Sequence, residues 1–350
     1  MVSIAITGAS GLVGAALVSV LAEAPDVERI VGLDVRVPQR RVSGLEFRLA
    51  DVAHSELKPL LEGIDVLVHL ASVVDPIPDV DLMARVNVGG TRRTLDAASA
   101  VGVRKVVRVS STAVYGAWAN NAIPLDEDAA LRPNPGFSPA VQGAEIERLL
   151  AEWRDDHPGV VVTTLRTAPV LGPGAEWLPS RLLLGRPPLR IRGTAPLVQA
   201  THVDDLVAAL ALVVLEDHPG VFNVASDGWL DPAAVRELLP RSAAPALPAG
   251  LVERLLERSW AIGLGDVPPG VVPYLQHPWV VANDRLKAIG WQPRRTNEEA
   301  VRAGVEALGP APRRGAFVGI VLAGIVSAGL GAWLLRRRRG ARRARRPTRR

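Results

Sequence analysis

A short run of β-branched and small apolar residues near the start of the chain leads into three evenly spaced glycines and then a helical pattern. The run is Val2–Thr7, the glycines are Gly8, Gly11 and Gly14, and the helical pattern extends to about Ala24. Glycine lets the backbone turn tightly between a strand and a helix. This order of strand, glycine turn and helix is typical of α/β proteins, and it constrains the fold more than any other feature of the sequence.

Short β-rich runs continue to alternate with helical stretches up to about Trp153. The later predicted strands are Arg29–Leu33, Val66–Leu70 and Lys105–Ser110, and the later predicted helices are Val88–Ala100 and Pro139–Trp153. Buried strands that alternate with amphipathic helices predict a parallel sheet covered on both faces. We therefore expect a Rossmann-like doubly wound α/β domain over residues 1–165.

Residues 166–307 are richer in proline and in short elements, with one clear helix predicted over Leu206–Glu216. They predict a smaller mixed α/β domain that encloses a substrate, with some elements able to return to the first domain. Residues 308–315 have the composition of a linker.

Composition excludes several classes of protein. The absence of cysteine excludes disulfides, thiolate catalysis and thiolate-ligated zinc or iron–sulfur sites. The six histidines form none of the spacings that metal ligation favours, so we expect no metal. With 48% hydrophobic and 22% charged residues in a chain of 350, disorder throughout is also excluded.

The glycine turn also predicts a binding site. Glycines let a pyrophosphate approach the backbone, and amides at the helix N-terminus meet its charge. Asp34 ends the second predicted strand twenty residues after Gly14, where a carboxylate accepts hydrogen bonds from adenosine ribose hydroxyls. Because that carboxylate repels a 2′-phosphate, the sequence favours NAD over NADP, although Arg36 weakens the preference. A glycine turn without a ligand is the alternative interpretation.

Further segments resemble a single family. They are Thr7–Gly14, Asp51-Val52, His69–Ser72, Asn87–Thr91, Val109–Gly116, Leu165–Gly174, His202–Asp205 and Phe222–Val224. Over about residues 2–305 the chain is similar to the extended short-chain dehydrogenase/reductases, the NAD-dependent epimerase/dehydratase group that includes nucleotide-sugar epimerases. The resemblance implies bound NAD and a nucleotide sugar or related small molecule as substrate.

The resemblance also implies roles for individual residues. Asp51 and Val52 would flank the adenine, Leu70 and Ala71 would line the dinucleotide groove, and Ser111 would place a catalytic hydroxyl near the reacting carbon. The predicted cofactor-binding residues are Gly8, Ser10, Gly11, Leu12, Val13, Gly14, Asp34, Asp51, Val52, Leu70, Ala71 and Ser72. Asn87 is expected to hold backbone in place instead.

The segment His202–Asp205 has two interpretations. A histidine beside two carboxylates indicates general base chemistry. Asp204 and Asp205 also precede the apolar run Leu206–Leu215, where they would cap a helix and favour its dipole. We prefer the second, structural interpretation.

The sequence departs from the family at the residues that carry its redox chemistry. Family members pair a tyrosine, which moves the proton that accompanies hydride transfer, with a lysine four residues later, which lowers the pKa of that tyrosine and binds the nicotinamide ribose. Pro139 aligns with the tyrosine and Gly143 with the lysine, and no Tyr-x-x-x-Lys occurs anywhere in the chain. The helix itself is expected to survive, with Ser138 as its N-cap.

Two functional hypotheses follow. Loss of a positioned general acid or base costs about 10²- to 10⁴-fold in rate, which favours a cofactor-binding protein whose ancestral reaction is abolished or severely weakened. The alternative is an active epimerase, dehydratase or oxidoreductase that uses substitute groups, for which Ser111, Thr112 and Tyr115 lie close in sequence.

Residues 316–335 are twenty residues without a charge, long enough to cross a bilayer as a helix at about 1.5 Å per residue. They predict a transmembrane helix, and a buried core helix is the alternative. Small residues recur every four positions at Gly319, Ala323, Ser327 and Gly331, a spacing that would let two such helices pack as a homodimer.

An arginine-rich tail over residues 336–350 supplies ten positive charges, and without these and Arg313 and Arg314 the formal net charge falls from +5 to −7. Lipid headgroups are its expected partner and nucleic acid is not, because the tail adjoins the apolar segment and lacks aromatic residues. No signal peptide is visible, so we expect the body in the cytoplasm, at the cytoplasmic membrane. Positively charged segments beside a membrane span usually stay in the cytoplasm as well, but a single span cannot leave both of its ends on one side. Either the short tail crosses the membrane or the helix lies in the membrane interface, and both alternatives stay open.

Overall fold

The computed structural model describes residues 1–307 except 39–41, 43, 185–188, 195 and 240–245. Met1–Ala307 form one compact unit. The predicted linker, transmembrane helix and arginine-rich tail, residues 308–350, lie outside the described residues. Within the part of the chain that the structure describes, no helix combines the length and the apolar character needed to cross a membrane.

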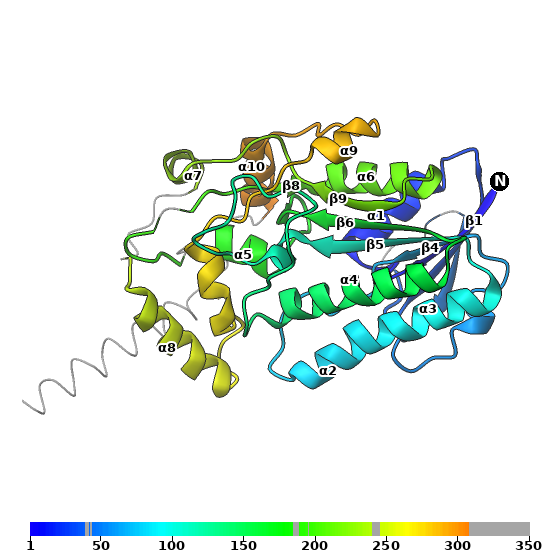
Figure 1. Ribbon diagram of the computed structural model, residues 1–350, viewed down its shortest axis with the longest axis horizontal. Helices are drawn as coiled ribbons and strands as arrows, with labels where there is room; N and C mark the ends of the chain where they lie inside the picture. The colour runs from blue at the N-terminus through cyan, green and yellow to red at the C-terminus, as the bar shows by residue number, and fades with distance from the viewer. Residues whose placement is uncertain (39–41, 43, 185–188, 195, 240–245, 308–350) are drawn as a thin grey trace, which may run out of the picture. The chain divides into compact units, whose positions relative to one another are not determined.

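Seven parallel strands form the central sheet in the order β3-β2-β1-β4-β5-β6-β9 (Figure 1). Their bounds are β1 Val2–Thr7, β2 Val27–Asp34, β3 Leu45–Leu49, β4 Val66–His69, β5 Lys105–Ser111, β6 Val161–Thr167 and β9 Gly220–Val224. The predicted Rossmann-like fold is confirmed. The strand order reverses between β1 and β4, and open α/β sheets bind ligands outside the carboxyl ends of the strands at such a point.

Helices cover both faces of this sheet (Figure 1). α1 (Leu12–Leu21) and α6 (Val203–Leu215) pack on one face, and α3 (Gly90–Val101) and α4 (Ser138–Asp156) pack on the other. Alternate residues of β1 enter the two cores, since Ile4 and Ile6 belong to the first and Ala5 to the second. Burial of apolar area on both faces, worth about 25 cal/mol per Å², is what fixes the carboxyl edge of the sheet as a rigid platform.

The other elements connect the strands or lie beyond their carboxyl ends. They are η1 Lys58–Leu60, α2 Val80–Ala84, η2 Arg85–Gly89, η3 Thr112–Tyr115, β7 Val170–Leu171, α5 Leu178–Leu184, β8 Thr201–His202, α7 Pro232–Leu238, α8 Ala249–Ala261, η4 Pro269–Leu275, α9 Asp284–Ala288 and α10 Asn297–Ala307. β7 and β8 pair with each other in a separate two-stranded sheet. Residues after 166 therefore supply the strand β9 to the main sheet and the helix α6 to one of its faces. The division into two domains at residue 165 stays a prediction.

The predicted N-cap of α4 was wrong. Ser138 is the first residue of the helix, and Phe137 precedes it without a side-chain capping bond. The Ser138 hydroxyl instead donates to Met83 Sδ at 3.7 Å, so it is directed toward α2 and away from the free N–H groups of its own helix. Pro139 lies in the first turn, where its missing N–H costs no hydrogen bond.

The prediction that Asp204 and Asp205 cap α6 was also wrong. His202 is the N-cap, and its Nδ1 accepts the N–H of Asp204 at 3.2 Å. The helix begins at Val203, two residues earlier than a cap at Asp204 would allow, so both aspartates lie in its first turn and favour its dipole. The buried Asp205 carboxylate accepts the N–H groups of Arg294 and Arg295 at 3.0 and 3.1 Å.

Candidate functional site

The glycine turn joins β1 to α1 at the carboxyl edge of the sheet. Gly8 has a φ of +75°, which L side chains rarely adopt, and a Cβ there would lie 2.9 Å from the Ala71 nitrogen. A Cβ at Gly14 would overlap the Gly8 carbonyl oxygen. Gly11 precedes α1 without a side-chain cap, and no acidic residue lies in the first turn. The free N–H groups of Leu12 and Val13 are thus left for an anionic group, which the helix dipole also favours.

The Asp34 carboxylate fixes the other side of this turn. It is 8% exposed, and it accepts the N–H groups of Ser10 and Arg36, both at 3.0 Å. The Ser10 hydroxyl in turn donates to the Arg36 carbonyl oxygen at 2.6 Å. A carboxylate has about four acceptor sites, so Asp34 keeps lone pairs for two ribose hydroxyls.

Asp51 and Val52 follow β3 at the same edge of the sheet. The Asp51 carboxylate lies 2.8 Å from His54 Nδ1 and accepts the Ala53 N–H at 2.8 Å. The hydrogen bond to His54 holds the pKa of Asp51 below its usual value, so the group is an acceptor at neutral pH. Val52 is buried against Gly90 at the start of α3, where a Cβ would lie 2.7 Å from Val52 Cγ2.

Leu70, Ala71 and Ser72 leave β4 directly beside the glycine turn. The Leu70 N–H donates to the Thr7 carbonyl oxygen and the Ala71 N–H donates to Thr7 Oγ1, both at 3.1 Å. These bonds tie the end of β4 to the end of β1. The two predicted walls of the dinucleotide groove therefore meet at the glycines.

Asn87 holds the backbone after β4, as expected from the sequence. Its Oδ1 accepts the Val73 N–H at 2.7 Å and the Ser72 hydroxyl at 3.1 Å. Its Nδ2 donates to the Val73 carbonyl oxygen at 3.1 Å and to Gln142 Oε1 on α4 at 2.9 Å. Because every polar atom of the side chain is used in this way, Asn87 positions the groove and offers no free group to a ligand.

Ser111 and the two replaced positions lie together at the end of β5. Ser111 is exposed, and its Oγ accepts the Ala113 N–H at 3.2 Å, which leaves the hydroxyl proton free. Ser111 and Pro139 line the same cavity. One turn further along α4, a Cβ at Gly143 would lie 3.0 Å from Val114 Cγ1, a tight contact for a side chain. Positions 139 and 143 therefore lie close to the end of β5, and neither carries a phenol or an amine.

Tyr115 does not take over the role of the missing tyrosine. The ring is 1% exposed, and its hydroxyl donates to Asn223 Oδ1 at 2.8 Å and accepts from Arg166 Nη1 at 2.7 Å. Burial raises the pKa of Tyr115 to about 12. Among the described residues that line the cavity, Tyr115 is absent. The phenol is therefore a neutral structural group of the core.

His202 is likewise outside the described cavity lining and serves as the helix cap. This placement supports the structural interpretation of His202–Asp205. Among the described residues, no group of three or more His, Asp or Glu side chains is placed to hold a metal ion. The expectation of no metal stays a prediction.

A buried ion pair near the site was not anticipated from the sequence. Glu147 on α4 and Arg166 on β6 are each about 6% exposed, and Arg166 Nη2 lies 2.6 Å from Glu147 Oε2. Burial lowers the pKa of Arg166, but the hydrogen bonds and charge of Glu147 outweigh it and leave that pKa raised. Ser110 also donates to Glu147. The pair locks α4, which carries positions 139 and 143, onto the strands beside Ser111.

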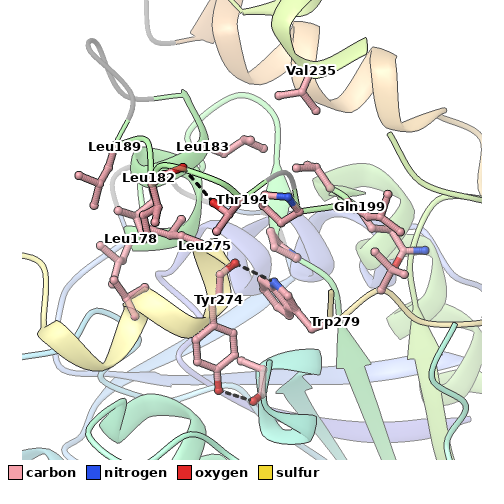
Figure 2. A pocket seen from close by; sticks show the side chains of 18 of the residues that line it. Leu178, Leu182, Leu183, Leu189, Thr194, Gln199, Val235, Tyr274, Leu275 and Trp279 are labelled. Atoms are coloured by element: carbon pink, nitrogen blue, oxygen red, sulfur yellow. Dashed lines mark hydrogen bonds between the residues drawn. The ribbon is translucent and has the colours of Figure 1, made fainter. Parts of the chain in front are cut away.

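Ser111 and Pro139 line a cavity of about 820 Å³. Figure 2 shows side chains of its wall, among them Leu178, Tyr274 and Trp279. Its walls come from α5, α7, η4 and residues 189–194 and 196–199, and its base comes from the ends of β5 and β6 and the start of α4. The volume is within the range of about 300–1,000 Å³ that small-molecule sites occupy. Sequence reasoning placed a substrate in this region but could not assemble its walls, because they come from segments far apart in the chain.

A glycine cradle at the strand-order reversal, an acidic residue ending β2 and a cavity at the same edge define a Rossmann-fold dinucleotide-binding protein with a substrate pocket. The model of the NAD dependent epimerase/dehydratase family matches residues 4–225, and the chain belongs to that family.

Curated relatives and solved structures agree with this assignment. The chain is 27% identical to an uncharacterised protein of Mycobacterium tuberculosis over 307 residues, which cover 84% of this chain and 81% of the relative. It is 29% identical to a dTDP-glucose 4,6-dehydratase of Streptomyces griseus over 249 residues, covering 64% and 74%. The structure of MoeE5 in complex with UDP-glucuronic acid and NAD matches at 24% identity with a TM-score of 0.68, covering 87% of this chain and 98% of that one. A UDP-glucose 4-epimerase of Thermus thermophilus in complex with NAD matches at 23% identity with a TM-score of 0.66, covering 89% and 100%.

Proposed function

We propose that the chain binds NAD(H) and is a degenerate or weakly active member of its family. The observation that carries the proposal is the contrast at one edge of the sheet, where the glycine turn and Asp34 are intact while Pro139 and Gly143 stand beside Ser111. A cofactor site survives there without its proton-handling partner.

The cradle fits a dinucleotide in this structure. Any side chain at Gly8 or Gly14 would fill the space at the turn, and the first N–H groups of α1 face that space without a side-chain cap. Asp34 would hold the ribose hydroxyls, and Asp51 and Val52 would flank the adenine. NAD supplies a hydride acceptor when bound. The relatives of known structure that contain NAD support the choice of this dinucleotide.

The chain's own residues handle protons poorly at this site. Ser111 can donate a hydrogen bond to a substrate oxygen, but an unassisted serine hydroxyl is too weak an acid to supply a proton. Tyr115 is buried and bonded to Arg166. The absence of a positioned general acid and base lowers the rate of the family's reaction about 10²- to 10⁴-fold. The alternative function, an active epimerase, dehydratase or oxidoreductase with substitute groups, is favoured by Ser111 lining the cavity and by the named activities of the relatives.

The proposal also covers the ligand class, the association with a membrane and the oligomeric state. A nucleotide sugar or related metabolite is the ligand class of the solved relatives. We place the body at the cytoplasmic membrane through residues 316–335 and the basic tail, with homodimerisation through the small-residue stripe. Protease accessibility of the tail in intact and in lysed cells tests the topology, because only a tail that crosses the membrane is cut in intact cells.

Restoring the missing pair should restore turnover. The native chain is expected to bind NAD without turnover. Pro139→Tyr with Gly143→Lys should raise the rate of turnover about 10²- to 10⁴-fold, because the tyrosine would transfer the proton and the lysine would bind the nicotinamide ribose. Calorimetric titration measures binding. Absorbance of reduced nicotinamide measures net oxidation of apolar secondary alcohols, and chromatography of the nucleotide sugars measures conversion of UDP-glucose and dTDP-glucose, because epimerisation and dehydration regenerate NAD within each cycle. Pro139→Phe with Gly143→Met is the matched control, since it adds similar bulk without titratable groups. Robust turnover by the native chain would refute the degenerate-site proposal.

Removing the charge of Asp34 should change the choice of dinucleotide. In Asp34→Asn the repulsion of a 2′-phosphate disappears while the shape is kept, so the ratio of NADP to NAD affinity is expected to rise at least tenfold in calorimetric titrations. Asp26→Asn is the control, because Asp26 is an exposed acid at the opposite end of β2. An unchanged ratio in Asp34→Asn would contradict the assigned ribose site.

A further inference from the structure

The walls of the cavity are apolar to an unusual degree for a site that would take a sugar. Leu178, Leu182 and Leu183 of α5, Val235 of α7 and Leu275 of η4 face it from different elements (Figure 2). Among the described residues that line the cavity there is no aspartate, glutamate, lysine, histidine or asparagine. These are the side chains that most often bind the hydroxyls of a sugar.

The polar side chains in the walls already use their hydrogen bonds within the protein. The two N–H groups of Gln199 Nε2 are shared among the Ser226, Gly228 and Val281 carbonyl oxygens, which lie 3.3, 2.9 and 3.0 Å away, and Oε1 accepts the Val281 N–H. The Tyr274 hydroxyl donates to the Ala113 carbonyl oxygen at 2.8 Å. These groups shape the wall and are not free for a ligand.

Two further polar wall residues are occupied in the same way. Trp279 Nε1 donates to the Tyr274 carbonyl oxygen at 3.2 Å, and the Thr194 hydroxyl donates to the Ile191 carbonyl oxygen at 3.1 Å. Tyr274 also packs edge-on against Trp279, with ring centroids 5.2 Å apart. The aromatic part of the wall therefore presents ring surface to the cavity.

The groups left for a ligand lie at two places. At the base, the Ser111 hydroxyl proton is free, and the hydroxyl of the buried Thr112 has no hydrogen-bond partner among the described residues. At the opening, the charged lining residues within the described part of the chain are Arg190, Arg192 and Arg236, all exposed. A hexose ring would bury several hydroxyls without partners in between, which costs free energy for each.

We propose that this cavity binds an amphiphilic anion, a molecule with an extended apolar body, an anionic group for the arginines and a hydroxyl or keto oxygen for Ser111 and Thr112. Apolar walls gain from an apolar body, and Arg side chains are suited to carboxylate or phosphate groups. The inference rests on the proposed NAD site and assigns the cavity a small molecule other than the nucleotide sugars of the solved relatives. It deepens the proposed function, because such an oxygen at Ser111 would lie beside the nicotinamide end of the dinucleotide cradle.

Binding can be measured on the full chain without turnover. The fluorescent probe 1-anilinonaphthalene-8-sulfonate, which has apolar rings and one anionic group, is expected to bind saturably and to be displaced by dodecanoate. Dodecanol, which has the same number of carbons but lacks the anionic group, should displace it at least fivefold less well, and UDP-glucose should leave it bound. Displacement by UDP-glucose but not by dodecanoate would overturn the proposal.

One pair of variants separates the cavity from the rest of the surface. Leu183→Asp places a charge in the wall and should weaken binding of the probe at least tenfold. Leu251→Asp makes the same change at an exposed position of α8 outside the described lining, and it should change binding less than twofold. Equal weakening in both variants would show that the probe binds nonspecifically and would refute the assigned cavity.

A second pair tests the arginines. Arg190→Gln with Arg236→Gln should weaken the binding of dodecanoate at least fivefold and leave the binding of dodecanol unchanged. Equal effects on both ligands would refute a binding site for an anionic group. NAD titration of the same preparations is independent of these readouts. Binding of dodecanoate without binding of NAD would refute the proposed function alone. Binding of NAD without binding of dodecanoate would refute this inference alone.

Discussion

Gly14→Ala is expected to weaken NAD binding by about 100-fold or more, or about 3 kcal/mol. A Cβ at this position would overlap the Gly8 carbonyl oxygen and would lie 2.9 Å from Ala9 Cα. Both neighbours are backbone, so no side chain can rotate away and the turn itself must shift. The shift moves the first N–H groups of α1 away from the pyrophosphate position. Calorimetric titration with NAD measures the loss.

Gly159→Ala is the matched control for this change. Gly159 lies between α4 and β6, has no strained φ, and nothing lies within 4 Å of a Cβ built there. We expect its NAD affinity to equal that of the native chain. Thermal unfolding of both variants shows whether the fold is kept. An affinity of Gly14→Ala within threefold of the native value would refute the cradle.

Arg166→Met is expected to destabilise the fold by about 3–5 kcal/mol, because it leaves the Glu147 carboxylate buried without its charged partner. Replacing both members, as Glu147→Leu with Arg166→Met, removes the unpaired charge and should recover most of this loss. Denaturant unfolding measures the free energies, and the double-variant cycle isolates the coupling between the two side chains.

Arg154→Met provides the contrast on the surface. Arg154 pairs with Asp155 at 2.7 Å, but the two side chains are 50% and 68% exposed. Solvent screens such pairs, so the change should cost less than about 1 kcal/mol. Equal losses in the free energy of unfolding for Arg154→Met and Arg166→Met would mean that burial of the Glu147–Arg166 pair does not determine how much the pair contributes to stability.

The sequence predicted the strands that lie in the middle of the sheet best. Buried parallel strands are continuous apolar runs, so Val2–Thr7 was predicted with the bounds that β1 has, and Val66–Leu70 ends one residue beyond β4. The bounds of the edge strand β3, Leu45–Leu49, were not predicted, because charged residues interrupt its apolar pattern and part of it is exposed. Helices α5, α7 and α8 were not predicted individually because they are short or lie in proline-rich sequence.

The cradle was predictable and the cavity was not, for a physical reason. A glycine turn is a local feature, since three residues within seven positions impose it. The cavity depends on packing between segments such as α5, η4 and the end of β5, whose side chains meet across more than a hundred residues of sequence. The buried Glu147–Arg166 pair was missed for a similar reason, because charged residues ordinarily predict an exposed surface.

The position of β9 in the main sheet restricts how this protein can change over evolution. β6 and β9 are neighbours in the sheet, yet the chain between them forms β7, α5, β8 and α6 and contributes residues 189–194 and 196–199 to the cavity wall. The nucleotide half and the ligand half are therefore interleaved, and no single crossover between two genes exchanges one half while keeping the other. Substitutions in the wall can instead change the ligand while the cradle is inherited unchanged.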